Sequence, residues 1–202
     1  MTLWRGDKPL ILASQSRARQ DLLANAGIAF EAVPAAIDER AVERESGLSS
    51  PDDVAARLAR EKALFVSARH PGRYVIGADQ TLALGARRFS KPADRAGAAE
   101  HLRALAGQTH ALHSAVAVAR DGEVLFTDVA TARMTMRPLA ETTIDAYLDQ
   151  AGTAALSSVG AYQLESLGIH LFERIEGDHF TILGLPLLPL LEFLRRERLL
   201  GF

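Results

Sequence analysis

Apolar and polar positions along the chain follow two different periods, and these periods predict where strands and helices lie. Short apolar or β-branched runs predict strands, whereas apolar residues spaced three or four apart predict helices. Strands are expected at residues 10–13, 29–35, 74–79, 109–120, 123–136 and 169–177. Helices are expected at residues 16–26, 50–69, 94–107, 141–152 and 186–198.

Cap and turn residues separate these segments. Ser50-Pro51 is typical of a helix start, and Gly27 of a helix end. Asp121-Gly122 between two β-rich runs predicts a tight hairpin, and residues 81–90 predict a second hairpin around Gly85. The polar stretch 37–49 is expected to be a loop or frayed turn. Strands alternate with helices first and hairpins follow, which indicates an α/β fold: a mixed, twisted sheet flanked by helices.

Composition narrows the class of protein. The chain has 202 residues, 48% of them hydrophobic, so it can form one sizeable domain, expected to span 1–202, or two lobes sharing a core. There is no cysteine, which excludes disulfides and Cys-ligated zinc and suits a cytoplasmic location. Lys plus Arg number 23 and Asp plus Glu 25, which argues against a polynucleotide partner. The leucine-rich segment 182–194 is too short to span a membrane.

Two cationic side chains fall on apolar helix faces. At 100° per residue, Arg19 projects to the same side as Leu22 and Leu23, and Lys62 falls within the apolar arc of residues 50–69. Each is either a side chain that snorkels to solvent or a ligand for an anion in a cleft. A buried ammonium without a partner would be costly, so Lys62 needs a counter-ion or a wet cleft.

Hydroxyl and acidic residues accompany these cations. Ser14 and Ser16 stand at the start of the first helix, where free N–H groups favour anions, although a plain N-cap explains them equally well. Asp79 ends the run "YVIGAD", where a parallel strand would open onto a binding crevice; a turn cap is the alternative. Lys91, held before a proline, either projects from a rigid corner or is an ordinary surface lysine.

Several blocks of sequence together resemble one family. They are "LILASQSRARQDLLANAGIAFE", "IDER", "AREKA", "VIGADQTL", "SKP", "LAGQTH" and "LGIHLFERIEGDHFTILGLPLLPL". In this order and over almost the whole chain, they are similar to the Maf family of nucleoside triphosphate pyrophosphatases. The resemblance implies a Maf/ITPase-like fold with two lobes around a central cleft. It also implies hydrolysis of a nucleoside triphosphate to the monophosphate and pyrophosphate with Mg²⁺ or Mn²⁺.

The resemblance assigns roles to particular residues. The family motif S-x-S-P-R-R reads S-Q-S-R-A-R at residues 14–19, so its second arginine is kept as Arg19. By resemblance Asp79 is the proton acceptor, and Lys62 and Lys91 bind phosphate. Glu39 falls at the family's acidic position in the substrate cleft. The serines of residues 14–19 would hold phosphate oxygens, and Asp79 with Glu39 would ligate the metal.

Substrate preference in this family is associated with three positions, held here by Ala18, Gln80 and Glu165. Gln80 and Glu165 resemble the branch that acts on 7-methyl-GTP, in which a tryptophan is common where Ala18 stands. A homodimer is expected by resemblance alone. Two other functions stay open: a regulator of cell division and septum formation that senses nucleotides without hydrolysing them, and an unrelated phosphomonoesterase that releases orthophosphate.

Overall fold

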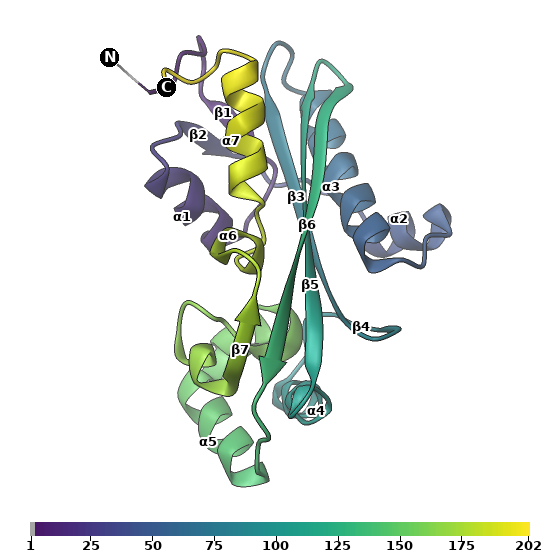
Figure 1. Cartoon of the computed structure of the whole chain (residues 1–202). Coiled ribbons are helices and arrows are strands. Elements are labelled where there is room, and N and C mark those ends of the chain that lie inside the picture. The colour runs from purple at the N-terminus through teal and green to yellow at the C-terminus, as the bar shows by residue number, and fades with distance from the viewer. Residues whose placement is uncertain (1–2) are drawn as a thin grey trace. The chain divides into compact units, whose positions relative to one another are not determined.

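The computed structural model describes residues 3–202 and contains seven strands that join one sheet (Figure 1). They are β1 (Leu10–Leu12), β2 (Phe30–Ala32), β3 (Val75–Leu84), β4 (Arg87–Phe89), β5 (Thr109–Arg120), β6 (Glu123–Met136) and β7 (Phe172–Glu176). Their order is β2-β1-β3-β5-β6-β7, and β4 pairs with β3. β1 pairs in parallel with β2 and β3, whereas the β3–β4 and β6–β7 pairs are antiparallel. The predicted mixed sheet is therefore confirmed.

The helices follow the predicted segments with two additions, α2 and the four-residue α6. They are α1 (Arg17–Asn25), α2 (Glu39–Ser46), α3 (Pro51–Ser67), α4 (Arg95–Leu105), α5 (Glu141–Ala151), α6 (His179–Ile182) and α7 (Leu187–Arg196). Short 3₁₀ turns are η1 (Gly152–Leu156), η2 (Val159–Ala161) and η3 (Leu167–Leu171). Across residues 3–202, no helix is both long and apolar enough to cross a membrane.

The longer addition is α2, and here the expectation of a loop at 37–49 was wrong. The carboxylate of Asp38 accepts a hydrogen bond from the backbone N–H of Ala41, which caps the helix. Gly47 ends it in the left-handed conformation, with φ of 64°. No residue of α2 is buried, so the helix has no apolar face that a hydrophobic pattern could reveal.

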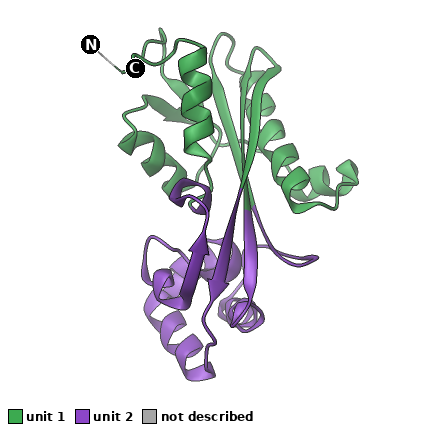
Figure 2. Ribbon diagram, in the orientation of Figure 1, with its two compact units in different colours: residues 1–80, 113–130, 183–202 green, residues 81–112, 131–182 purple. Residues whose placement is uncertain are grey.

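The chain divides into two compact units (Figure 2). Unit 1 comprises residues 1–80, 113–130 and 183–202, and unit 2 comprises residues 81–112 and 131–182. Strands β3, β5 and β6 each contribute residues to both. Each unit has its own buried apolar residues.

In unit 1, α3 lies against the sheet through small residues. Alanines of α3 and of β5 form one buried cluster that includes Ala59, Ala63 and Ala117. Gly77 of β3 makes this close approach feasible, because a Cβ there would lie 2.1 Å from the carbonyl oxygen of Ala59 and 2.6 Å from the backbone nitrogen of Ala63. A glycine inside a strand often marks such a backbone contact. The sequence therefore holds α3 unusually close to the strand that carries Asp79.

The hairpin between β5 and β6 has the turn that its sequence predicts. Asp121 and Gly122 have φ of 52° and 80°, the two positive values that a type I′ turn requires. The carboxylate of Asp121 accepts a hydrogen bond from the backbone N–H of Gly72 at 2.6 Å, and the Gly122 N–H donates to Ser67 Oγ at 3.1 Å. These contacts fix the hairpin to the end of α3 and to the segment between α3 and β3.

Unit 2 has its own apolar core, built from α4, α5, β7, the start of β5 and the end of β6. Within it, His110 Nε2 lies 2.7 Å from the hydroxyl of Tyr162, and both side chains are buried. Burial lowers the pKa of His110 to about 4 and raises the pKa of Tyr162. His110 is therefore neutral in the folded protein at neutral pH.

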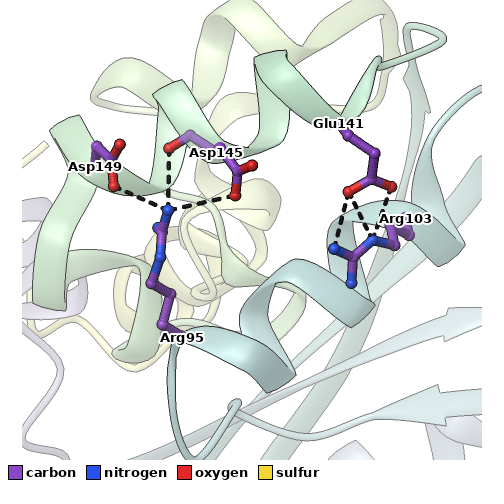
Figure 3. A network of polar contacts seen from close by, with 5 residues as sticks. All are labelled: Arg95, Arg103, Glu141, Asp145 and Asp149. Atoms are coloured by element: carbon purple, nitrogen blue, oxygen red, sulfur yellow. Dashed lines mark hydrogen bonds and ion pairs between the residues drawn. The ribbon is translucent and has the colours of Figure 1, made fainter.

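Exposed ion pairs connect α4 and α5 on the surface of unit 2 (Figure 3). Arg103 contacts the Glu141 carboxylate through both Nε and Nη2, and Arg95 Nη2 lies 2.9 Å from Asp149 and 3.4 Å from Asp145. Exposed pairs of this kind contribute little to stability. The apolar core rather than these charges holds the two helices together.

Candidate functional site

Arg19, in the first turn of α1, is held in place by hydrogen bonds to other residues of unit 1. Ser16 is the N-cap, and its hydroxyl accepts from the backbone N–H of Arg19 at 3.5 Å. The Arg19 guanidinium donates from Nε to the Gly184 carbonyl at 2.7 Å, and from Nη1 to the Ala78 carbonyl at 2.9 Å and Ser14 Oγ at 3.3 Å. Within the described part of the chain, no residue accepts a hydrogen bond from Nη2. Arg19 is therefore held rigidly with one nitrogen left for a ligand.

The helix geometry expected for this segment is confirmed. Arg19 points inward, whereas the side chain of Arg17 is 87% exposed and pairs with Asp21 at 3.0 Å. Burial lowers the pKa of Arg19, and the charges of Asp79 and Glu39 oppose that shift. An arginine guanidinium keeps its proton in proteins, so the group stays cationic. Ala18 is partly buried on the same first turn.

Asp79 does not end its strand, and that expectation was wrong. β3 continues to Leu84 because buried Thr81, Leu82 and Ala83 extend the apolar pattern beyond the aspartate. Asp79 is only 7% exposed and lies in the middle of the strand. A buried carboxylate in a strand needs a charged partner nearby.

Lys62 of α3 is that partner. Its Nζ lies 2.6 Å from Asp79 Oδ1, and the side chains of the two residues are 9% and 10% exposed. Asp79 and Gly77 are two residues apart on β3, so they share the face that packs on α3. The close approach that Gly77 allows therefore also brings Lys62 to Asp79. The lysine has the counter-ion that its place in an apolar arc required.

Glu39 adds a second carboxylate to the same ammonium. It is the first residue of α2, and its Oε1 lies 2.7 Å from Lys62 Nζ. Its side chain is 51% exposed, so it forms the solvent side of the cluster, whereas Asp79 forms the buried side. Lys62 thus joins helix α2 and strand β3 through one nitrogen atom.

Gln80 follows Asp79 on β3 and points to the other side of the strand. Its Nε2 donates to Ser114 Oγ of β5 at 2.9 Å, and Ser114 is fully buried. The carboxamide of Gln80 is therefore oriented by a neighbouring strand. Ser114 carries no signal in the sequence, because one serine within a β-rich run is unremarkable until its cross-strand neighbour is known.

The structure brings most of the predicted site residues together in unit 1, but not all. Arg19, Lys62, Asp79 and Glu39 form one connected set with the serines at residues 14 and 16. Lys91 is exposed in the segment before α4, and Glu165 precedes η3; both belong to unit 2. The roles of these two residues stay predictions.

The acidic residues suit a metal that also binds a substrate. Among residues 3–202 there is no group of three or more His, Cys, Asp or Glu side chains placed to hold a metal by themselves. Asp79 and Glu39 lie close together because both contact Lys62 Nζ. Mg²⁺ is commonly held by one or two carboxylates together with substrate phosphates and water. This donor pair fits that mode of binding.

Two glycines that support the site were missed from the sequence. Gly77 had a signal, because a glycine inside an apolar strand predicts a close backbone approach. Gly184, with φ of 91°, had none: its carbonyl contacts an arginine 165 residues away, and a Cβ there would lie 3.3 Å from Arg19 Nε.

Comparison with known proteins extends these observations. The model of the Maf-like protein family matches residues 9–197. A nucleoside triphosphate pyrophosphatase of Rhodopseudomonas palustris is 70% identical over 201 residues, covering 100% of both chains. A 7-methyl-GTP pyrophosphatase of Rhizobium etli is 60% identical over 188 residues, covering 92% of this chain and 94% of that protein.

A solved structure gives a more distant likeness. It is a nucleoside-triphosphatase / dITP/XTP pyrophosphatase from Mycobacterium abscessus, 19% identical, with a TM-score of 0.39. The match covers 65% of this chain and 76% of that chain. A likeness at this level adds nothing to the assignment of the site.

Proposed function

The chain belongs to the Maf-like protein family, and from this premise we propose that it is a nucleoside triphosphate pyrophosphatase. It would hydrolyse the bond between the α- and β-phosphates and release a nucleoside monophosphate and pyrophosphate. Relatives that match over their full length carry this activity in their names. The observation that carries the proposal for this chain is the buried contact of Lys62 with Asp79, next to the immobilised Arg19.

The cations would bind the phosphates. Arg19 is fixed by two backbone carbonyls, so little conformational entropy is lost when its Nη2 donates to a phosphate oxygen. The Lys62 ammonium would exchange its contact with Glu39 for a contact with a phosphate oxygen, because the Glu39 carboxylate is half exposed and readily solvated. Lys91 of unit 2 is assigned to the phosphates by family resemblance. Fixed charges of this kind stabilise the transition state of phosphoryl transfer.

Asp79 would act on the attacking water. As an oxygen–phosphorus bond forms at the α-phosphorus, the bond to the bridging oxygen breaks and pyrophosphate leaves with its electron pair. The proton of the water passes to the Asp79 carboxylate, which Lys62 Nζ holds at 2.6 Å. The contact with Lys62 fixes the orientation of the carboxylate and leaves Oδ2 for this task.

A divalent cation, Mg²⁺ or Mn²⁺, belongs to the same proposal. Asp79 and Glu39 would hold it together with the substrate phosphates, which is the mode that the acidic pair fits. When bound, such a cation makes water more acidic and neutralises charge on the leaving group. An Asp79→Asn variant distinguishes a role as base from a role as metal ligand. If the substitution lowers only the affinity for metal, a higher metal concentration restores activity; if it removes the base, activity stays low.

The base preference is a finer proposal. Gln80 and Glu165 resemble the branch that acts on 7-methyl-GTP, and the Rhizobium etli relative is a 7-methyl-GTP pyrophosphatase. Ser114 Oγ accepts a hydrogen bond from Gln80 Nε2 at 2.9 Å and so orients the carboxamide. Ala18 offers no aromatic ring for stacking where that branch commonly has tryptophan. We therefore propose 7-methyl-GTP as a substrate whose base is not stacked on an aromatic side chain at position 18.

The test is a panel of canonical and modified triphosphates, including 7-methyl-GTP, assayed with Mg²⁺ and with Mn²⁺ for each phosphate product. The proposal predicts pyrophosphate and monophosphate in equal amounts. Orthophosphate as the first product would point to a phosphomonoesterase instead. Saturable binding of triphosphates without any product would point to a nucleotide-sensing regulator of division.

Two further expectations belong to the proposal. The absence of cysteine is compatible with work in a reducing cytoplasm. A homodimer is expected by resemblance, and light scattering coupled to size-exclusion chromatography measures the mass directly. A mass that matches the 21.8 kDa chain at micromolar concentration would contradict the dimer.

A further inference from the structure

A hollow in unit 1 lies away from Asp79. It has a volume of about 290 Å³ and is lined by the segment before β1, the segment before β3, Arg120 at the end of β5, and Leu199. Tyr74 lines it and directly precedes β3, whereas Asp79 follows five residues later along the strand. At about 3.3 Å per residue, roughly 16 Å of extended strand separates the two positions. The hollow is therefore not part of the site around Asp79.

Positive side chains dominate its lining, although the chain as a whole has a net charge of −2. Arg5, Lys8, Arg73 and Arg120 line it, against a single acid, Asp7. Four cations that meet at one hollow in a chain with more acids than bases are not explained by composition.

Three of these cations differ in how many hydrogen-bond and ion-pair partners they have within the protein. Arg73 is fully engaged, since its guanidinium donates to the Pro9 carbonyl at 2.6 Å and pairs with Glu31 at 3.2 Å. The Lys8 ammonium, in contrast, has no ion-pair or hydrogen-bond partner among residues 3–202.

Arg120 is satisfied only in part. Its Nη1 donates to the hydroxyl of Tyr74 at 3.2 Å, and its guanidinium lies over that ring at 4.9 Å. Its Nε is buried and has no hydrogen-bond acceptor; Asp121 Oδ2 lies 3.4 Å away without hydrogen-bond geometry. Buried donors are rarely left without an acceptor. The Arg120 side chain as a whole is 41% exposed, and no described residue accepts a hydrogen bond from its Nη2, which leaves that nitrogen for a ligand.

Aromatic side chains complete the hollow. Trp4 lines it, and its Nε1 donates to the Lys8 carbonyl at 2.9 Å, which fixes the segment that carries both residues. The ring packs on Gly6, where a Cβ would lie 2.5 Å from it. Backbone hydrogen bonds of Arg5 to Leu199 at 2.9 Å hold this segment to the end of the chain. The lining is thus built from ordered elements.

We propose that this hollow is a second ligand site that binds a small phosphate-bearing anion through Lys8 and Arg120. Guanidinium and ammonium groups are the usual protein partners of phosphate oxygens, and Tyr74 and Trp4 offer ring faces to an attached base. The proposal does not depend on catalysis at Asp79, because the two sites share no residue.

The single tryptophan of the chain makes the site directly observable. Trp4 fluorescence is followed while the full chain is titrated with inorganic phosphate, pyrophosphate, a nucleoside monophosphate or the uncharged nucleoside, at constant ionic strength. We expect saturable binding of at least one phosphate-bearing probe and none of the nucleoside. Binding of inorganic phosphate identifies a simple anion site, and binding of the monophosphate alone identifies a nucleotide site; both support the proposal.

Variants test the residues. Lys8→Gln and Arg120→Met are each expected to weaken binding at least ~10-fold, equivalent to about 1.4 kcal/mol. Arg44→Gln, which removes an exposed arginine of α2 outside this lining, is expected to bind like wild type. Arg120→Met loses the contact with Tyr74, which could disturb folding of that variant. Lys8 is exposed, so Lys8→Gln is expected to fold normally and keeps the test valid. A fluorescence signal that never saturates, equal binding of nucleoside and monophosphate, or wild-type affinity in Lys8→Gln would overturn the proposal.

Discussion

Replacing Lys62 by methionine perturbs the contact on which the proposed site depends. Methionine keeps most of the apolar stem but removes the ammonium, which leaves Asp79 buried at 7% exposure without its counter-ion. Removing one partner of a buried ion pair typically costs about 3–5 kcal/mol. Glu39 adds at most about 1 kcal/mol, because its side chain is 51% exposed. We therefore expect Lys62→Met to lower the free energy of unfolding by about 3–5 kcal/mol and to abolish turnover.

A double-mutant cycle, measured by urea denaturation, tests whether the loss of stability in Lys62→Met comes from the interaction between Lys62 and Asp79. Asp79→Asn replaces the buried carboxylate, which has lost its counter-ion, by a neutral amide. The double variant Lys62→Met/Asp79→Asn is therefore expected to be more stable than Lys62→Met alone. The matched control is the pair Arg57–Glu61 on the same helix, 2.8 Å apart with side chains 50% and 30% exposed. Its coupling is expected to be only about 0.3–0.5 kcal/mol.

Either of two results would show that Lys62 and Asp79 do not form a buried ion pair that stabilises the fold. One is a loss of stability in Lys62→Met no larger than that in Arg57→Met. The other is additivity of the two changes in the Lys62→Met/Asp79→Asn variant, which would mean that the residues do not interact in solution.

Three further predictions concern the surroundings of the site and the core of unit 2. Gly77→Ala is expected to lower both kcat and the melting temperature, because its Cβ would press against α3 and shift Lys62; unchanged kcat by pyrophosphate release would contradict this. Gly184→Ala, at φ of 91°, should raise KM for triphosphate by disturbing the Arg19 contact, and an unaltered KM would show that this contact is dispensable. Because burial lowers the pKa of His110 to about 4, the unfolded chain binds more protons between pH 6.5 and 4, so stability is present above pH 6.5 and is lost as pH falls. The loss from this group is about 2 kcal/mol at pH 5. Urea denaturation of His110→Gln should show a correspondingly smaller difference between pH 8 and pH 5, and an equal difference would remove His110 as the cause.

Most of the fold could be predicted because local rules agree with the tertiary structure in this chain. The Asp121-Gly122 turn permits the positive φ values of its hairpin, and Asp94 caps α4 through the Gly97 N–H at 2.8 Å. Ser50 stands at the predicted N-cap of α3, although its hydroxyl bonds to Asp52 rather than to the backbone. Each of these signals depends on residues only a few positions apart.

Failures arose where the deciding partner was remote or where no burial signal existed. No residue of α2 is buried, so only its cap residues, Asp38 and Gly47, could have indicated this helix. The apolar pattern predicts that β3 ends at Asp79 because a charge interrupts the run, whereas Lys62 satisfies that charge inside the sheet. An ion pair between residues on different elements is not visible in hydrophobic periodicity.

For the site, sequence pattern indicated which side chains were anomalous but not what they contact. An inward Arg19 and a lysine in an apolar arc follow from helix geometry. That Arg19 is held by the carbonyls of Gly184 and Ala78 depends on segments brought together by folding. The roles of Lys91 and Glu165 rest on family resemblance.

The most direct test of the proposed function is the product balance of the purified protein and of its Asp79→Asn variant with a nucleoside triphosphate and Mg²⁺. The account predicts that wild type forms one pyrophosphate for each monophosphate. It also predicts that the variant, folded by circular dichroism, loses at least ~100-fold in kcat. Near-normal turnover in the folded variant, or orthophosphate in place of pyrophosphate from wild type, would contradict it.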